Sequence, residues 1–444
     1  MADQTPSAGG GTAVSARVAS DARDLASAAI GQVTEPERRR RPSAPRDPPT
    51  TEWQRSRPQR VENFLEFTSG PKVRVQEGLN GVRGMAVIPV VAFHLGYFQI
   101  LGGAQLVMSL FFTQSGFLIT TLILHEYERT GKLALGPFWA ARARRILPPA
   151  WLTIAAVGIL RLTTKAFDIP NRLDMVTAFT HVSNWYLYFS DAIVDAIADG
   201  RSSELNHTWS LSIEEQFYVV IAVLAVVLVA AAARPLVWLR WIAIVGATLS
   251  FALPFVFAMN DERVFYGTDT RAGELLVGVA LATFLIYRDV RVRLLQMTWV
   301  VAALATVALG AAMVLWHEAT PRSRMLENGL LPVGSALWVL VIVGAMTPDG
   351  PVAWLVHGRF LRWLGKLSYG IYIYHFPVLT LVRYYTSFHT FALTVTVVPL
   401  TLAISVLSYR FVEMPVRRRQ ITGKPLAIGA TALVGIIAVT TALT

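Results

Sequence analysis

The sequence predicts an all-α polytopic membrane protein, with about ten core transmembrane helices, one extra C-terminal transmembrane helix and a disordered N-terminal tail. Hydrophobic residues occupy 54% of the 444 positions, whereas charged residues occupy only 16%, well below their share in soluble domains. Apolar runs of membrane-spanning length recur from Leu79 to the C-terminus. We therefore expect a lipid bilayer to surround most of the chain.

Three regions are expected along the chain. They are a disordered basic cytoplasmic tail at 1–75, a membrane domain at 76–420 and an additional C-terminal transmembrane helix at 421–444. The tail is rich in alanine, serine, proline and arginine, a composition that cannot bury a core. Its run of arginines after Glu37 either attracts anionic lipid or only helps to fix the topology, and both readings remain open.

Eleven apolar stretches are candidates for transmembrane helices. They lie at 82–100, 105–124, 147–164, 211–232, 241–258, 271–287, 298–316, 329–346, 367–385, 391–411 and 426–443. A further stretch at 174–190 is short and aromatic, so we expect it to be re-entrant or interfacial.

Charges in the loops support this assignment of spans. If 174–190 does not cross, basic residues such as those at 142–145 and 417–419 gather on one side of the membrane. The opposite loops carry Asp191, Asp195, Asp199 and Glu204. Basic loops remain cytoplasmic, so the N-terminus is predicted to be cytoplasmic and the chain to lie in the inner membrane.

Composition also excludes several kinds of site. The net charge is +11, but the basic residues cluster between apolar spans and form no basic groove, so nucleic acid is not an expected partner. The chain has no cysteine, which removes disulfides, thiolate metal sites and a cysteine nucleophile. No metal site is predicted.

Two ionisable residues, Arg83 and His94, lie in the first apolar stretch. They are eleven positions apart, which on a helix places both on one face, roughly 16 Å apart along the axis. Charged groups are costly in hydrocarbon, so the pair favours a polar pathway or reaction site. The alternative is a snorkelling arginine and a histidine that bonds to a neighbouring helix.

A second set of candidates lies at two other helix starts. Arg142 and Arg145 are one turn apart, and their guanidinium groups suit phosphate oxygens, although an ordinary topogenic loop has the same composition. Glu214 and Glu215 open an apolar helix shortly after His207. These carboxylates either belong to a reaction site with the histidine or only complement the helix dipole.

The remaining candidates are weaker. Asp269 and Arg271 could orient a sugar, or Asp269 could cap a helix with Arg271 as its surface partner. Tyr374 and His375 place a hydroxyl and an imidazole inside a span, where interhelical hydrogen bonding is the simpler interpretation.

Together these stretches resemble the acyltransferase-3 family of integral-membrane O-acyltransferases, which includes enzymes that acetylate O-antigen and other cell-envelope sugars. The matching motifs run in family order from about residue 79 to 419, and are LNGVRG with His94, LFFTQSGFLIT, FWAARARRILPP, HTWSLSIEEQFY, YGTDTRAGELLVG, LGKLSYGIYIYHFPV and VEMPVRRR. The resemblance implies a ten-helix catalytic unit and a thioester donor, acetyl-CoA or another short acyl-CoA.

Three residue pairs carry over from the family motifs. They are Arg83 with His94, treated as essential in the family, Arg142 with Arg145 in its basic cytoplasmic motif, and Glu214 with Glu215 as its paired carboxylates. One departure is Ser109, because relatives often have an aspartate there; if that carboxylate orients the histidine in relatives, another group must do so here. Many relatives append a hydrolase-like domain, which is not expected in this chain.

The sequence therefore predicts an O-acyltransferase that moves a short acyl group, acetyl by preference, from acyl-CoA to a hydroxyl of a cell-envelope carbohydrate or glycolipid. His94 is the expected general base, with Glu214 or Glu215 orienting it. Arg142 and Arg145 are expected to bind the CoA phosphates, and Arg83 to guide the cofactor arm. The expected contacts to the acceptor are His207, Asp269, Arg271, Tyr374 and His375.

Two other functions stay open at this stage. The acceptor could be a small hydroxylated metabolite such as a macrolide, or the chain could be a glycolipid transporter or flippase. A transporter would not consume a thioester. Direct transfer and an acyl-histidine relay are equally compatible with the sequence.

Overall fold

The computed structural model describes residues 52–70, 72–74, 76–97, 103–164, 172–190, 203–319 and 329–443. These residues form helices and connecting loops, with no β-strand among them. Met1–Arg55, which ends in the short helix α2 (Glu52–Arg55), is one unit, and Ser56–Thr444 is the other. The arginine run of the tail and the acidic loop residues Asp191, Asp195 and Asp199 lie outside the described residues.

Eleven helices in the described part of the chain have 17 residues or more, and each overlaps one of the predicted stretches. They are α4 (Glu77–His94), α5 (Ala104–Thr130), α6 (Leu135–Thr163), α10 (Trp209–Ala231), α11 (Pro235–Val256), α13 (Thr268–Leu285), α15 (Thr298–Glu318), α16 (Leu330–Met346), α18 (Arg359–Tyr385), α19 (Thr390–Ser408) and α21 (Gly423–Leu443).

Seven membrane-spanning candidates, all within the described residues, are long and apolar enough to cross a bilayer. They comprise α5, α6, α10, α11, α15, α19 and α21, some with a short extension. The remaining long helices are α4, α13, α16 and α18. The chain is therefore a multi-pass helical membrane protein, whereas the predicted count of about ten core spans is not confirmed.

The aromatic stretch at 174–190 forms two short helices, α7 (Arg172–Phe179) and α8 (Ser183–Phe189). At about 1.5 Å per residue neither can cross a hydrocarbon layer of about 30 Å, so the prediction that this stretch does not span is confirmed. Arg161 of α6 holds α7 in place, with its guanidinium 2.7 Å from both Asp174 and Glu204. Burial raises the pKa of Glu204 above its usual value.

The prediction that a disordered tail extends to residue 75 is wrong for its last part. Helix α3 (Arg57–Leu65) precedes a turn, and Phe64 and Phe67 on either side of the helix end are fully buried. The Phe67 ring stacks on Phe117 of α5 with 6.0 Å between centroids. Arg57 also pairs with Asp349 at 2.7 Å. Two aromatic residues three positions apart therefore anchor a segment whose average composition is that of a tail.

The other short helices of the described residues connect the long ones. They are η1 (Asn206–Thr208), α12 (Asp261–Tyr266), α14 (Arg288–Gln296), α17 (Pro351–Val356), η2 (Tyr409–Glu413) and α20 (Met414–Arg417). The C-terminal helix α21 packs against α6 and α7.

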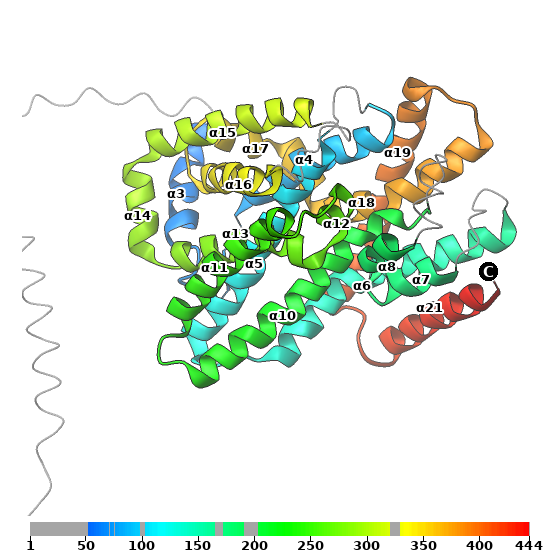
Figure 1. Cartoon of the computed structure of the whole chain (residues 1–444), viewed down its shortest axis with the longest axis horizontal. Helices are drawn as coiled ribbons and strands as arrows, with labels where there is room; N and C mark the ends of the chain where they lie inside the picture. The colour runs from blue at the N-terminus through cyan, green and yellow to red at the C-terminus, as the bar shows by residue number, and fades with distance from the viewer. Residues whose placement is uncertain are drawn as a thin grey trace, which may run out of the picture. The chain divides into compact units, whose positions relative to one another are not determined.

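Glycines let α4 approach its neighbours closely, and this approach positions the site. A Cβ atom on Gly81 would overlap the carbonyl oxygen of Val356, and one on Gly84 would overlap that of Leu361 in α18. In return, a Cβ on Gly365 would overlap the carbonyl of Asn80 in α4. Small residues permit this backbone-to-backbone packing of membrane helices. The contact brings the polar residues of α4 beside those of α18 (Figure 1).

Candidate functional site

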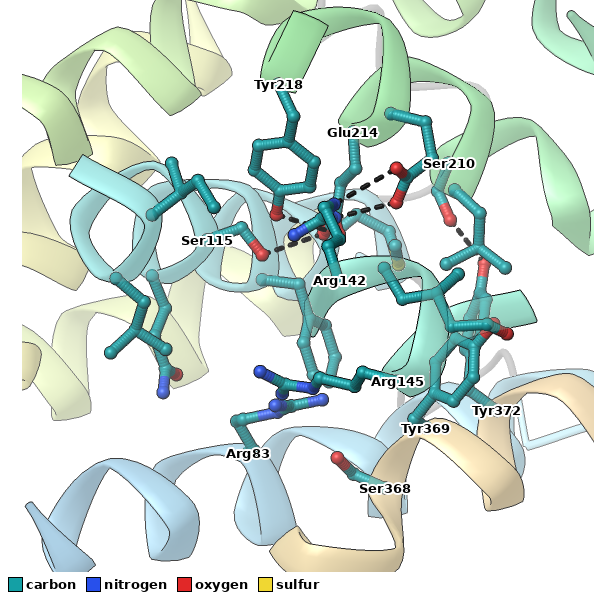
Figure 2. Close-up of a pocket in the computed structure, with 18 of the residues that line it drawn as sticks. Arg83, Ser115, Arg142, Arg145, Ser210, Glu214, Tyr218, Ser368, Tyr369 and Tyr372 are labelled. Carbon is teal, nitrogen blue, oxygen red and sulfur yellow. Dashed lines mark hydrogen bonds and ion pairs between the residues drawn. The ribbon is translucent and has the colours of Figure 1, made fainter. Parts of the chain in front are cut away.

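Two neighbouring cavities contain most of the ionisable residues singled out in the sequence. The arginine cavity lies between α4, α5, α6, α10 and α18 and encloses about 930 Å³, including the space at its open side (Figure 2). Its polar lining consists of Arg83, Gln114, Ser115, Arg142, Arg145, Ser210, Glu214, Glu215, Tyr218, Ser368, Tyr369 and Tyr372. The histidine cavity encloses about 560 Å³ and is lined by Val90, Phe93, His94, Met108, Asn206, His207, Trp209, Phe265, Tyr372 and Phe376.

Arg142 is neutralised by a carboxylate. Its guanidinium makes two hydrogen bonds to Glu215, Nη2 to Oε1 at 2.6 Å and Nε to Oε2 at 3.0 Å. The carbon of the guanidinium also lies 3.4 Å from the centre of the Tyr218 ring, in the geometry of a cation–π contact. This arrangement joins α6 to α10 and neutralises the charge of Arg142.

Glu214 lines the same cavity as Glu215, but it is held by hydroxyl groups. It accepts a hydrogen bond from Ser115 at 2.9 Å and one from Tyr218 at 3.2 Å. The two adjacent carboxylates therefore have different partners. Neither carboxylate has His94 among its contacts. The expectation that Glu214 or Glu215 orients this histidine is therefore wrong, because both side chains line the arginine cavity and His94 lines the other one.

Arg83 and Arg145 present open guanidinium groups to the same cavity. Neither makes a hydrogen bond or an ion pair with another described residue, and Arg145 is exposed while Arg83 is half-buried. The two side chains point into one part of the cavity (Figure 2). Arg417 lies close enough to interact electrostatically with both. Glu413 lies within electrostatic range of all three arginines, and Glu214 within range of Arg83. Three guanidinium groups near two carboxylates still suit a multiply charged anion such as a phosphate ester.

His94 ends α4 and opens onto the histidine cavity. Its Nδ1 lies 2.9 Å from the carbonyl oxygen of Val90 and 3.2 Å from Nε2 of His375. Nδ1 of His375 in turn lies 2.7 Å from the carbonyl of Tyr372. A carbonyl can only accept a hydrogen bond, so we assign the proton of each ring to Nδ1. The His94 Nε2 atom then carries a lone pair.

The sequence placed His375 among the acceptor contacts, and the structure gives it a different position. His375 is 1% exposed and lies behind His94, where it does not line either cavity. Tyr374 also lies outside both cavities, because its hydroxyl forms a hydrogen bond with the hydroxyl of Ser408 in α19, at 2.7 Å. Hydrogen bonding between helices, the simpler interpretation, describes both residues.

His207 forms part of the cavity wall. Its Nε2 donates to the carbonyl of Ile373 at 3.1 Å, and its ring stacks on Phe376 with 5.4 Å between centroids. Tyr372 donates its hydroxyl hydrogen to the carbonyl of His207 at 2.7 Å and accepts a hydrogen bond from Ser210 at 2.6 Å. These bonds hold the wall between the two cavities.

Arg271 is fully buried and lines neither cavity, so the structure contradicts its assignment as an acceptor contact. It pairs with Glu274 at 2.8 Å, and its guanidinium carbon lies 5.1 Å from the centre of the Phe112 ring. The predicted surface pair of Asp269 with Arg271 is also wrong. Asp269 pairs instead with Arg263 of α12 at 2.6 Å and remains 43% exposed. Two positions on a helix correspond to about 200°, so Asp269 and the buried Arg271 lie on opposite sides of α13.

The two cavities share Met108 and Tyr372 as lining residues. Arg83 and His94, predicted to share a helix face, therefore lie in different cavities that meet at one wall. Met108, Ser115, Tyr218 and Tyr372 were not predicted from the sequence. For Ser115, a hydroxyl on a membrane helix was an available signal.

The chain is similar to known acyltransferases. The family model described as an acyltransferase domain matches residues 76–410. The peptidoglycan O-acetyltransferase OatA of Listeria monocytogenes is 31% identical over 348 residues, covering 77% of this chain and 55% of the relative. The O-acetyltransferase OatA of Staphylococcus aureus strain NCTC 8325 is 31% identical over 368 residues, covering 81% and 60%.

The match spans less than two thirds of the length of these relatives. No solved structure matches the chain. The family match covers most of the membrane region, including every residue that lines the two cavities. The chain therefore belongs to the acyltransferase-3 family.

Proposed function

We propose that this protein transfers a short acyl group, acetyl by preference, from acyl-CoA to a hydroxyl of a cell-envelope carbohydrate or glycolipid. The observation that supports this most is the meeting of two unlike cavities at Met108 and Tyr372. One cavity holds open guanidinium groups for a phosphorylated donor. The other holds an imidazole with an open nitrogen for an alcohol.

The donor would bind from the side of the basic loops. Arg83 and Arg145 form no ion pair or hydrogen bond with a carboxylate among the described residues, although Glu413 lies within electrostatic range of both, so they are the groups that we assign to the CoA phosphates. This revises the pair inferred from sequence, because Arg142 is already paired with Glu215. The positive-inside rule makes this side cytoplasmic, and with it the N-terminus, in the inner membrane.

The thioester must then reach His94. Arg83 and His94 lie roughly 16 Å apart along α4, and the flexible arm of CoA would pass along this helix face to the shared wall at Tyr372. The apolar lining of the histidine cavity, which includes Trp209, Phe265 and Phe376, would limit the access of water to the thioester.

In the transfer step, Nε2 of His94 accepts the proton of the acceptor hydroxyl as its oxygen attacks the acyl carbon. A carbon–oxygen bond forms, and the carbon–sulfur bond of the thioester breaks. The resulting thiolate takes a proton, delivered by the His94 imidazolium, and leaves as free CoA. The products are an ester and CoA, and the imidazole returns to its neutral form.

His375 would act as a positioning residue. It accepts a hydrogen bond from Nδ1 of His94 and so keeps the proton on that nitrogen, which leaves Nε2 available as the base. The chain lacks the aspartate that relatives often have at position 109, and the carbonyl of Val90 together with His375 supplies the orientation instead.

The proposed class of acceptor is inferred from the relatives, one of which is named a peptidoglycan O-acetyltransferase. The test uses the purified protein in nanodiscs with acetyl-CoA labelled in its acetyl group, an oligosaccharide acceptor and, separately, a small alcohol. We expect labelled ester on the oligosaccharide together with release of CoA. Transport of a glycolipid without thioester cleavage would reject the proposal in favour of a flippase, and transfer to the alcohol alone would favour a small-molecule acceptor.

A further inference from the structure

A group of aromatic side chains at α8 lies beside the histidine cavity and has no part in the chemistry proposed above. Trp185, Tyr188 and Phe189 are on α8, and Arg263 and Asp269 come from α12 and the start of α13. We call these five residues the aromatic platform. The platform adjoins the cavity through α12, because Phe265, two positions after Arg263, lines the cavity and packs on Trp209 with 4.3 Å between centroids.

The rings of the platform are arranged as a surface and not as a core. The Trp185 and Phe189 rings are stacked, with centroids 6.0 Å apart and planes 20° apart, and Tyr188 meets Phe189 edge-on at 4.8 Å. Phe189 is 73% exposed. Apolar faces of this size on a rigid helix suit the C–H-rich face of a sugar ring, which meets the negative face of an aromatic π-system.

A charged pair borders these rings. The guanidinium carbon of Arg263 lies 5.1 Å from the centre of the Trp185 ring and 5.6 Å from that of Tyr188. The same guanidinium donates two hydrogen bonds to Asp269, at 2.8 and 2.6 Å. Asp269 keeps a 43% exposed side chain, so its carboxylate can accept further hydrogen bonds from hydroxyl groups.

The platform is held rigidly against the bundle. The side-chain amide of Asn184 donates to the carbonyl of Tyr266 and to the hydroxyl of Thr268, both at 2.9 Å. Gln216 of α10 donates to the Asn184 side-chain oxygen at 2.9 Å. This network fixes α8 relative to α12 and α10, the helices that also form the cavity wall. A ligand on the platform would therefore sit at a defined position relative to His94.

We propose that the aromatic platform binds a sugar ring of the acceptor glycan and directs a hydroxyl of that glycan toward His94; this inference rests on the proposed function. Aromatic residues also anchor membrane proteins at the lipid interface. A partly exposed arginine–aspartate pair is costly in hydrocarbon, however, and places the platform in an aqueous or headgroup layer. The pairing of stacked rings with an exposed carboxylate favours a polyhydroxylated ligand over a lipid chain.

The experiment measures steady-state acetyl transfer in nanodiscs to an oligomer of N-acetylglucosamine, together with acetyl-CoA hydrolysis in the absence of acceptor. Trp185→Ala and Phe189→Ala should each raise the KM for the oligomer about three- to tenfold, the loss expected for one ring contact. The kcat at saturating oligomer and the hydrolysis rate should stay unchanged. Trp185→Phe, which keeps a ring, should recover most of the affinity.

Phe391→Ala is the matched control, because Phe391 is 74% exposed, like Phe189, but belongs to α19. An unchanged KM in active Trp185→Ala and Phe189→Ala proteins would overturn the inference and leave the proposed function intact. An equal rise in KM for Phe391→Ala would also overturn it, in favour of a general membrane anchor. If the wild-type protein transfers acetyl to no acceptor, the proposed function and the inference both fail.

Discussion

Nδ1 of His94, at the end of α4, lies 3.2 Å from Nε2 of His375 on α18, although 281 residues separate the two histidines in the chain. The contact depends on the glycine-mediated approach of α4 to α18. It connects the packing of the helices to the chemistry, because it determines which nitrogen of His94 faces the cavity.

Replacing His375 should therefore impair the reaction without removing a group that touches substrate. We expect His375→Ala to lower kcat about tenfold while the KM for acyl-CoA stays unchanged, because His94 loses one of the two groups that orient its ring and hold its Nδ1 proton. His375→Gln, whose amide oxygen can accept the same hydrogen bond, should recover part of the activity. Equal losses in both variants, accompanied by reduced thermal stability, would indicate a purely structural role.

The open arginines should govern donor affinity. Arg83→Ala and Arg145→Ala should each raise the KM for acetyl-CoA by about tenfold or more, because each removes a charge-assisted hydrogen bond to phosphate. The same variants should change the KM for acetyl-pantetheine, which has no phosphate, much less. Arg144→Ala is the control, since Arg144 is on the same helix but does not line the cavity. An equal effect on both donors would contradict the assignment.

The Arg142–Glu215 pair should act as a structural unit between α6 and α10. Both side chains are mostly buried, at 12% and 18% exposed, so removing one partner leaves a charge without compensation. We expect Arg142→Ala and Glu215→Ala each to lower thermal stability in detergent, and the double variant to lose less than the sum of the two. The measurement is thermal unfolding of the wild type, the two single variants and the double variant. If the stability losses of the single variants add up to that of the double variant, the two residues do not depend on each other.

The close contact of α4 with its neighbours can be tested by adding one methyl group. Gly81→Ala should lower the midpoint of thermal unfolding and reduce transfer, because the new Cβ would overlap the carbonyl oxygen of Val356 and push α4 away. Gly310→Ala is the matched control, since a Cβ there meets no atom within 4 Å. A Gly81→Ala protein as stable and as active as Gly310→Ala would mean that α4 has room to move.

Features that depend on local spacing were predictable from the sequence. The apolar runs located the eleven long helices of the described residues, and the helix-turn spacing of Arg142 and Arg145 placed both in one cavity. The combination of Arg83 and His94 in one apolar stretch pointed to the region where the two cavities meet.

Features that depend on contacts between distant segments were not predictable. His375 and Glu215 find their partners through helix packing, across 281 and 73 residues, and no pattern in a single sequence encodes such pairings. The burial of Arg271 has the same origin: Glu274 lies one turn further along α13 and neutralises it inside the bundle. The segment around Phe64 was wrongly predicted to be disordered. Its average composition is that of a tail, and this average hides the two buried aromatic residues Phe64 and Phe67.

The most direct test of the central claim is the rate of acetyl transfer from acetyl-CoA to an oligosaccharide by His94→Ala protein in nanodiscs, compared with wild type. We expect the His94→Ala protein to transfer acetyl about 10²–10⁴-fold more slowly than wild type, with unchanged thermal stability and unchanged acetyl-CoA affinity, because the alcohol loses its proton acceptor. A well-folded His94→Ala protein that transfers acetyl at the wild-type rate would contradict the account.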